Sequence, residues 1–326
     1  MAEPNTEMPE VLVLGRPTIF QFYDEQLSQK FRILKPWESS LPLDQFISTH
    51  AQSVQAVMCS PKGIGSQLSS SLLRLFPLLR LIVTTSAGVD HIDLAECRRR
   101  GISVASAATV FSEDVADFAV GLLIDVLRKI SAADRFVKNG LWPVQGDFPL
   151  CSKVGSRKVG IVGLGSIGLK VAQRLEAFGC IISYISRKKK PVPYPFYTDV
   201  HELATRCDVL VICCASTDQT RHLIDEEVLL ALGKEGIIIN IARGDIIKEM
   251  ELIQCLVQGK IAGAGLDVFK NEPNVPEELL SLDNVVLSQH VAFLTEESFR
   301  DLYELISGNL EAFFLNKPLL SPVLDD

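Results

Sequence analysis

One stretch of the sequence decides the fold: KVGIVGLGSIGLKVAQRLEAFG, residues 158–179. Its apolar first five residues predict a buried strand, and its second half predicts an amphipathic helix that ends at Gly179. The apolar face of this helix is expected to consist of Ile167, Val171, Leu175 and Phe178. A glycine-rich turn that joins a strand to a helix in this way is typical of a doubly wound parallel sheet.

The turn has the pattern Gly-x-Gly-x-x-Gly and consists of Gly163, Leu164, Gly165, Ser166, Ile167 and Gly168. Gly163 permits the tight turn, Gly165 lets a pyrophosphate approach the backbone, and Gly168 lets the helix and the strand pack closely. The N-terminus of the helix adds N–H donors and partial positive charge. A plain glycine-rich turn is the alternative, but the flanking strand and helix favour dinucleotide binding.

The strand predicted at 180–185 is followed by Ser186, Arg187 and Lys188, and not by a carboxylate. In NAD-specific sites an acid at this point accepts a hydrogen bond from the ribose 2′-hydroxyl. A hydroxyl followed by cations suits a 2′-phosphate instead, so we expect NADPH to be the preferred cofactor, with NADH possible. The alternative is a solvated basic loop, which is what charge runs usually are.

The composition limits the possible functions. The chain has 326 residues, 47% of them hydrophobic and 22% charged, which is enough for two domains with their own cores. A formal net charge of −8 argues against nucleic-acid binding, and no apolar run approaches the roughly 20 residues of a membrane span. The eight cysteines show no metal-binding pattern, so we expect buried free thiols and no metal site. The first residues contain no apolar leader, which predicts a cytoplasmic protein.

The first hundred residues alternate short β-branched runs with amphipathic stretches, which predicts βα units around a parallel sheet. The predicted strands are 11–14, 56–59, 81–84 and 102–104, and the predicted helices are 68–79 and 94–100. The second half repeats the rhythm. Its predicted strands are 158–162, 180–185, 209–213, 237–241, 261–266 and 285–287.

Two further segments connect these halves. Residues 112–137 have helical periodicity and predict one long linking helix, followed by an exposed, irregular connection at 143–149. A final helix at 296–315 comes after the second sheet is complete, so we expect it to return to the first domain. The predicted fold is therefore α/β, with two doubly wound parallel-sheet (Rossmann-like) domains and a cleft between them. The substrate domain is 1–111 plus 294–326, and the dinucleotide-binding domain is 112–293.

Three segments that follow predicted strands carry candidate reacting residues: NIARG at 240–244, GLDVFKNEP at 265–273 and SQHVA at 288–292. Together with the glycine turn and SAGVDHID at 86–93, they make the chain resemble the D-isomer-specific 2-hydroxyacid dehydrogenases. Within that family it is similar to the plant-type glyoxylate/hydroxypyruvate reductases and the hydroxyphenylpyruvate reductases. The resemblance covers nearly the whole chain.

The chemistry of 2-oxo acid reduction explains these residue types. A planar guanidinium such as that of Arg243 can bridge the substrate carboxylate and carbonyl, and it polarises the carbonyl as charge develops on the oxygen. His290 is a natural proton donor near neutral pH, and Glu272 would orient the ring and stabilise its charged form. Taken singly, each residue also has an ordinary structural explanation, as a surface ion pair, a strand-end histidine or a helix-start acid.

The resemblance implies further roles. Arg243, Glu272 and His290 take the catalytic positions, and Arg243 also lies at the cofactor. Ala87, Gly88 and Val89 occupy the loop that offers backbone N–H groups to the substrate carboxylate. Residues at the nicotinamide are implied to be Ile241, Ala242 and Asp267.

The expected activity is NADPH-preferring reduction of small 2-oxo acids, glyoxylate and hydroxypyruvate, to D-2-hydroxy acids. An aryl pyruvate is the alternative substrate, and a dinucleotide-sensing interaction protein is the rival class. The length and apolar face of segment 112–137 favour a homodimer over simple burial between domains. The chain departs from the family pattern at Ala215, Lys248, Gln289 and Phe293, and Phe293 is expected to narrow or wall the substrate pocket.

Overall fold

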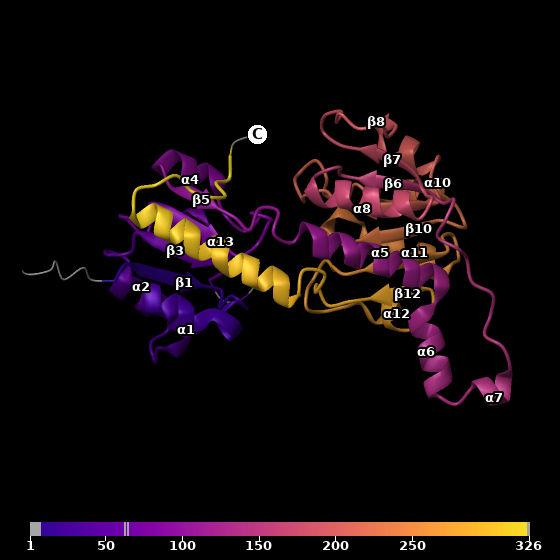
Figure 1. Ribbon diagram of the computed structural model, residues 1–326, viewed down its shortest axis with the longest axis horizontal. Coiled ribbons are helices and arrows are strands. Elements are labelled where there is room, and N and C mark those ends of the chain that lie inside the picture. Colours follow the sequence, from indigo (N-terminus) through magenta and orange to yellow (C-terminus); the bar gives the residue numbers. More distant parts are fainter. Residues whose placement is uncertain (1–7, 62, 64, 325–326) are drawn as a thin grey trace, which may run out of the picture. The chain divides into compact units, whose positions relative to one another are not determined.

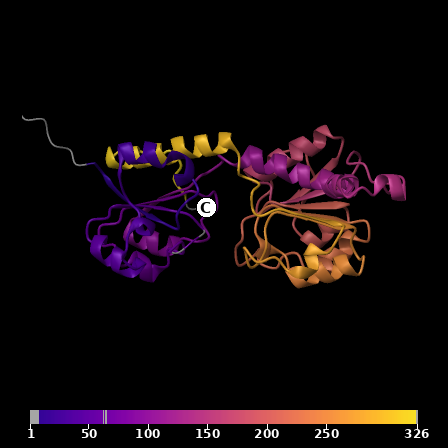
Figure 2. The same cartoon turned by 90° about the horizontal axis from the view of Figure 1, so that it is seen from below.

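The computed structural model describes residues 8–61, 63 and 65–324. The chain forms two compact units, one from Met1–Phe111 with Thr295–Asp326 and the other from Ser112–Leu294 (Figure 1). Each contains one sheet, and all registered strand pairs in both sheets are parallel. Helices cover both faces of each sheet (Figure 2). The predicted α/β fold with two doubly wound parallel sheets is confirmed.

The sheet of the first unit has five strands in the order β2-β1-β3-β4-β5. They are β1 (Glu10–Leu14), β2 (Arg32–Leu34), β3 (Ala56–Cys59), β4 (Leu81–Thr84) and β5 (Ser103–Ala105). The helices of this unit are α1 (Phe20–Lys30), α2 (Leu43–His50), α3 (Ser70–Leu73), α4 (Leu94–Arg100) and α13 (Glu296–Phe314), with one 3₁₀ turn at Pro36–Glu38. The sequence did not predict β2, which has only three residues and lies at the edge of the sheet.

The predicted helix at 68–79 is wrong in length, because α3 ends at Leu73. Continuing the helix would require an N–H at position 77 to pair with the carbonyl of Leu73, and Pro77 has none. The guanidinium of Arg100, at the end of α4, donates to the carbonyl oxygens of Leu73 and Phe76 instead. In contrast, α4 ends as predicted at Gly101, which has a left-handed φ of 68°.

Helix α13 lies with the first unit although it follows the second unit in sequence. Tyr303 stacks on Tyr23 of α1 with ring centroids 4.7 Å apart, and Phe299 meets Phe22 edge-on at 5.4 Å. Lys30 forms an ion pair with Glu311 at 2.7 Å. The C-terminal helix is therefore part of the core of the N-terminal unit.

The sheet of the second unit has seven strands in the order β12-β11-β10-β9-β6-β7-β8. They are β6 (Lys158–Val162), β7 (Ile181–Ile185), β8 (Phe196–Tyr197), β9 (Val209–Ile212), β10 (Ile237–Asn240), β11 (Gly263–Leu266) and β12 (Val285–Leu287). Its helices after β6 are α8 (Ser166–Ala177), α9 (Val200–Ala204), α10 (Glu226–Leu232), α11 (Glu249–Val257) and α12 (Glu277–Leu280), with a 3₁₀ turn at Gly244–Ile246. The sequence predicted six of these strands and missed β8, an edge strand of two residues.

The predicted single helix at 112–137 is wrong: it is two helices, α5 (Ser112–Arg128) and α6 (Ile130–Lys138). Lys129 between them is left-handed, with φ of 51°. The carboxylate of Asp125 holds the break, because it accepts hydrogen bonds from the backbone N–H and the hydroxyl of Ser131. Beyond α6, the connection predicted to be irregular contains a one-turn helix, α7 (Trp142–Gln145), with Pro143 in its first turn.

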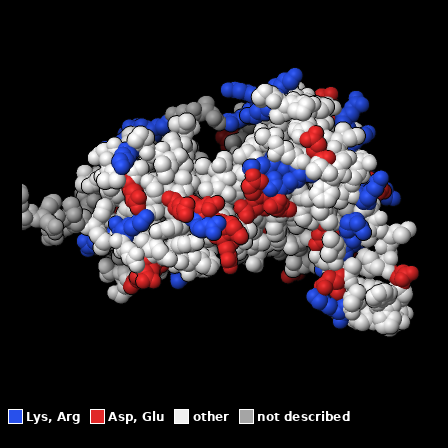
Figure 3. All heavy atoms as spheres, viewed as in Figure 1, with Lys and Arg blue, Asp and Glu red and all other residues white. Residues whose placement is uncertain are grey.

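Helix α8 packs along α5, where acidic and basic side chains lie next to one another (Figure 3). Glu113 of α5 pairs with Lys170 and Arg174 of α8, and Asp117 pairs with Arg174. The predicted apolar face of α8 is correct for Val171 and Leu175, whereas Phe178 lies at the C-terminus and is 49% exposed. In the part of the chain that the structure describes, no helix is both long and apolar enough to span a bilayer.

Candidate active site

The glycine turn after β6 is built by close backbone contacts. A Cβ at Gly163, whose φ is 101°, would lie 2.6 Å from the backbone nitrogen of Cys214, and one at Gly168 would lie 2.1 Å from the Gly163 carbonyl oxygen. Both positions therefore require glycine. Gly165 differs, because a Cβ there would meet no protein atom within 4 Å. Its open side lies at the N-terminus of α8, which has no side-chain cap.

These features fit the pyrophosphate of a dinucleotide. Uncapped N–H groups at the start of a helix attract an anion, and the missing side chain at Gly165 leaves room for it. Leu164 is buried, Ser166 is exposed and Ile167 is half-buried. Burial raises the pKa of the neighbouring Cys214 thiol to about 11, and it raises the pKa of Cys213 as well. Both thiols stay neutral near pH 7 and place no negative charge beside the turn.

The predicted 2′-phosphate segment follows β7, the strand next to β6. Ser186 is half-buried, and its hydroxyl donates to the backbone carbonyl of Lys188 at 2.7 Å. The side chains of Arg187 and Lys188 are exposed. Tyr184, which the sequence reasoning did not single out, is fully buried, and its hydroxyl accepts from the backbone N–H of Lys190 at 2.8 Å. The tyrosine thereby holds the basic loop at the carboxyl end of β7.

The loop after β10 carries Arg243. Asn240 at the strand end is 1% exposed and holds this loop, since its amide accepts from the Ala242 N–H at 3.1 Å and donates to the Arg243 carbonyl at 2.9 Å. Ile241 and Ala242 are buried, and the half-buried Arg243 side chain donates from Nη1 to the Ala242 carbonyl at 2.8 Å. The sequence reasoning assigned no role to Asn240, although an amide at the end of a buried strand is a usable signal.

His290 and Glu272 form a direct pair. The His290 Nδ1 atom lies 2.8 Å from Oε2 and 3.1 Å from Oε1 of Glu272, and both side chains are about four-fifths buried, with 20% and 23% exposed. Glu272 Oε1 also accepts from the backbone N–H of Phe269 at 3.3 Å. Because the carboxylate occupies the Nδ1 side, the Nε2 atom is the one turned toward other partners. Phe293 meets the imidazole edge-on, with ring centroids 6.0 Å apart.

Asp267 at the end of β11 organises the loop that carries His290. Its carboxylate is 1% exposed and accepts from the Ser288 hydroxyl at 2.7 Å and from the N–H groups of Val291 and Ala292 at 2.9 and 3.1 Å. These bonds bracket His290, which has a left-handed φ of 58°. Sequence reasoning placed Asp267 beside the nicotinamide and did not anticipate this contact with the histidine loop.

The strand order brings most of the predicted residues to one edge of the second sheet. The strands β10, β11 and β12 are consecutive in the sheet. Arg243 follows β10, Asp267 and Glu272 follow β11, and His290 follows β12. The glycine turn follows β6 on the same edge. The first unit holds the other predicted segment, in the loop after β4: Ala87 is exposed, and Gly88 and Val89 are half-buried. Among residues 8–61, 63 and 65–324, the N–H groups of these three residues donate no hydrogen bond.

Lys248, one of the departures from the family pattern, forms ion pairs instead of a helix cap. It precedes α11 and gives it no side-chain cap, and its ammonium group pairs with Glu251 at 3.3 Å and Asp225 at 3.7 Å.

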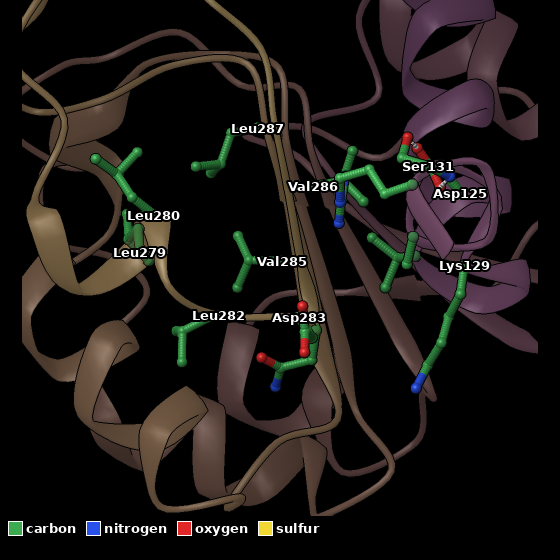
Figure 4. A pocket seen from close by; sticks show the side chains of 14 residues that line it. Asp125, Lys129, Ser131, Leu279, Leu280, Leu282, Asp283, Val285, Val286 and Leu287 are labelled. Carbon is green, nitrogen blue, oxygen red and sulfur yellow. Dashed lines mark hydrogen bonds between the residues drawn. The ribbon is translucent and has the colours of Figure 1, made fainter. Parts of the chain in front are cut away.

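A different cavity, of about 410 Å³, lies beside the edge strand β12 (Figure 4). It is lined by β12 and by residues around α12, α5 and α6, and it contains none of the predicted site residues.

Comparison with known proteins identifies the family. The family described as D-isomer specific 2-hydroxyacid dehydrogenase, NAD binding domain, matches residues 120–292. The chain belongs to this family. A glyoxylate/hydroxypyruvate reductase of Arabidopsis thaliana is 52% identical over 97% of this chain and 97% of its own. A hydroxyphenylpyruvate reductase of Plectranthus scutellarioides is 44% identical over 97% of this chain and 100% of its own.

Solved structures of similar proteins support the same family assignment. A 2-hydroxyacid dehydrogenase from Ketogulonicigenium vulgare has a TM-score of 0.89 at 35% identity and covers 97% of this dehydrogenase and 98% of its own chain. An NADPH-dependent glyoxylate/hydroxypyruvate reductase from Sinorhizobium meliloti, in complex with NADP and malonate, has a TM-score of 0.88 at 34% identity and covers 97% of both chains. The family predicted from the sequence motifs is confirmed.

The glycine turn makes a testable distinction between two alanine variants. Gly165→Ala should leave the melting temperature nearly unchanged, because its Cβ meets no protein atom, but should raise the Kd for NADPH at least about tenfold by blocking the pyrophosphate. Gly168→Ala should destabilise the protein by about 3 kcal/mol, because its Cβ would overlap the Gly163 carbonyl. Thermal unfolding and cofactor fluorescence titration measure both. Unchanged NADPH affinity in Gly165→Ala would contradict the assignment.

Proposed function

We propose that the protein reduces small 2-oxo acids, with glyoxylate and hydroxypyruvate as preferred substrates, to D-2-hydroxy acids at the expense of NADPH. The observation that carries the proposal is the pair of His290 and Glu272 at 2.8 Å, in the loops after β12 and β11; these two strands come directly before β10, the strand that precedes Arg243, in the sheet order. A paired acid–base group and a guanidinium on one sheet edge supply what carbonyl reduction needs from a protein. The 52% identical Arabidopsis relative is named for these two substrates.

The proposed mechanism assigns one task to each residue. When bound, the reduced nicotinamide supplies a hydride for the carbonyl carbon of the substrate. Arg243 binds the substrate carboxylate and carbonyl through its planar fork and stabilises the negative charge that develops on the carbonyl oxygen. His290 gives the proton held at Nε2 to that oxygen, while Glu272 keeps the ring oriented through Nδ1. The reverse sequence oxidises the hydroxy acid.

The loop Ala87, Gly88 and Val89 of the first unit is proposed to bind the substrate carboxylate. Three consecutive backbone N–H groups that donate to no described residue are suited to a carboxylate, because charge-assisted hydrogen bonds are stronger than neutral ones. Ile241, Ala242 and Asp267 are proposed to border the nicotinamide. Asp267 then has two tasks, since it also holds the loop of His290.

Within this reaction, the alternative substrates differ in the size of the 2-oxo acid. An aryl pyruvate is the alternative, and a relative 44% identical over 97% of this chain is named hydroxyphenylpyruvate reductase. Phe293 favours the smaller acids, because its ring lies against the catalytic imidazole and takes up space beside it. A dinucleotide-sensing interaction protein would have no need for the complete set of Arg243, Glu272 and His290, so we place it behind both enzymatic options.

NADPH is proposed over NADH because of the loop after β7. Arg187 and Lys188 offer two exposed cations, the Ser186 hydroxyl braces their loop by donating to the Lys188 carbonyl, and this segment contains no carboxylate to repel a phosphate dianion. The Sinorhizobium meliloti relative is described as NADPH-dependent and was crystallised with NADP.

We further propose a cytosolic homodimer. Helices α6 and α7 and the segment after them carry exposed apolar side chains: Ile130, Val137, Trp142, Val144 and Leu150, between 54% and 100% exposed. Such a segment is better suited to an interface than to water. The eight cysteines are all free thiols, which fits a reducing compartment. Sedimentation as a 35.9 kDa monomer at micromolar concentration would contradict the dimer.

The central experiment follows NADPH absorbance with glyoxylate, hydroxypyruvate and an aryl pyruvate. Arg243→Ala should lower kcat/KM about 10²–10³-fold, because it removes a charged donor from the developing oxyanion. The control Arg206→Ala removes an exposed guanidinium elsewhere in the same unit and should change kcat/KM less than about twofold. If the unmodified protein oxidised no NADPH with any 2-oxo acid, the enzymatic function would be wrong.

The cofactor preference has its own test. In the double variant Arg187→Ala/Lys188→Ala the KM for NADPH should rise about ten- to a hundredfold, since two charge-assisted contacts to the 2′-phosphate are lost. The KM for NADH should stay within about twofold, because NADH has no phosphate there. Lys234→Ala, an exposed lysine elsewhere in this unit, serves as the charge control. Equal losses for both cofactors would argue against a phosphate contact.

A further inference from the structure

A buried polar cluster lies beneath the loop that follows β4. It consists of Cys59 at the end of β3, Thr84 at the end of β4, and His91 at the far end of the loop. Cys59 and Thr84 are fully buried, and His91 is 3% exposed. Burying a polar side chain destabilises a protein unless the side chain is hydrogen-bonded, so hydrogen bonds are expected within this cluster.

The cluster is linked to the loop by a chain of hydrogen bonds. Nε2 of His91 lies 3.0 Å from Oγ1 of Thr84, and that oxygen lies 3.2 Å from Oγ of Ser86. The hydroxyl of Ser86 donates to the carbonyl of Gly88. Thr84 Oγ1 also accepts from the backbone N–H of Ser86 at 3.3 Å. The chain therefore runs from the buried imidazole to the middle of the loop.

Counting hydrogens gives the chain a direction. Ser86 has one hydroxyl hydrogen, which goes to the Gly88 carbonyl, so in the contact between the two hydroxyls Thr84 is the donor. The hydroxyl hydrogen of Thr84 is then used in this bond, so Thr84 Oγ1 can only accept a hydrogen bond from His91. The imidazole must carry its proton on Nε2, with Cys59 Sγ at 3.6 Å from the same nitrogen. Burial raises the pKa of Cys59 to about 12, so this neighbour stays an uncharged thiol.

Bonds between described backbone groups hold both ends of the loop. Ala107 N–H donates to the Ser86 carbonyl at 3.0 Å, Ile92 N–H donates to the Val89 carbonyl at 3.0 Å, and Leu68 N–H donates to the His91 carbonyl at 2.9 Å. The bond from the Ser86 hydroxyl fixes the Gly88 carbonyl. Because a peptide group is planar, fixing this carbonyl also orients the N–H of Val89.

We propose that His91 is a positioning residue for substrate binding, which acts through Thr84, Ser86 and the Gly88 carbonyl to orient the N–H group of Val89 toward the carboxylate of the 2-oxo acid. This inference rests on the proposed function, because it takes that loop as the carboxylate site. This series of hydrogen bonds only orients the loop. It therefore affects the affinity for the acid, whereas hydride and proton transfer depend on residues of the second unit. Preorganised donors bind an anion more tightly, because no conformational entropy is lost in ordering the loop when the anion binds.

The test compares kinetic constants of His91→Leu with those of the unmodified protein, with glyoxylate and NADPH as substrates. The KM for glyoxylate should rise about tenfold, the effect of disordering one charge-assisted contact, while kcat and the KM for NADPH stay within about twofold. His91→Gln, whose amide can place an N–H near the position of Nε2, should restore most of the affinity. The exposed histidine variant His201→Leu controls for the substitution itself.

A second pair of variants keeps the test valid if His91→Leu fails to fold. Thr84→Val preserves the shape of the side chain but removes the hydroxyl, so it should raise the KM for glyoxylate as His91→Leu does, and Thr84→Ser should not. Unchanged KM in Thr84→Val, or a loss of kcat equal to the rise in KM, would overturn the positioning role. An unmodified protein without turnover would instead refute the proposed function, and this inference with it.

Discussion

Parallel strand pairing is the constraint on which the functional site of the second unit depends. When neighbouring strands run in the same direction, all their carboxyl ends lie on one edge of the sheet, and the loops that follow them meet there. In this unit the order β12-β11-β10-β9-β6-β7-β8 places the loops of His290, Glu272 and Arg243 on consecutive strands and the glycine turn two strands further along. Residues separated by more than a hundred positions thus come to the same edge of the sheet through strand order.

Buried polar side chains then determine the shape of each loop. Asn240 holds the loop of Arg243, Asp267 holds the loop of His290, and Tyr184 holds the basic segment after β7. In the first unit, Thr84 and His91 hold the loop after β4 in the same way. These groups are nearly inaccessible to water. In such a buried environment a hydrogen bond is stronger than at the surface, and a buried polar group without a hydrogen bond destabilises the fold more. The pattern separates residues that would contact substrate from residues that keep them in place.

Sequence reasoning was accurate where one local signal decided the outcome. Short apolar runs predicted β3, β4, β6, β9 and β10 well, because a fully buried parallel strand needs little beyond a continuous run of apolar residues. It failed where a distant partner decided. The edge strands β2 and β8 are too short to carry a pattern, and the break at Lys129 depends on Asp125 accepting from Ser131. Helix α3 ends at Leu73, and Pro77, which has no N–H, is a signal within the sequence against the predicted extension to residue 79.

By itself, the sequence determined the fold class, the family, the position of the glycine turn and the identities of the candidate acid, base and guanidinium. These follow from local order along the chain: a strand, a turn with glycines where no Cβ fits, and a helix. Only the tertiary structure decided that Glu272 reaches the Nδ1 side of His290, that Asp267 brackets the histidine, and that His91 is linked to Ser86 through Thr84. Side-chain pairs of this kind depend on strand order and on distances between loops, and these are properties of packing that no stretch of sequence contains.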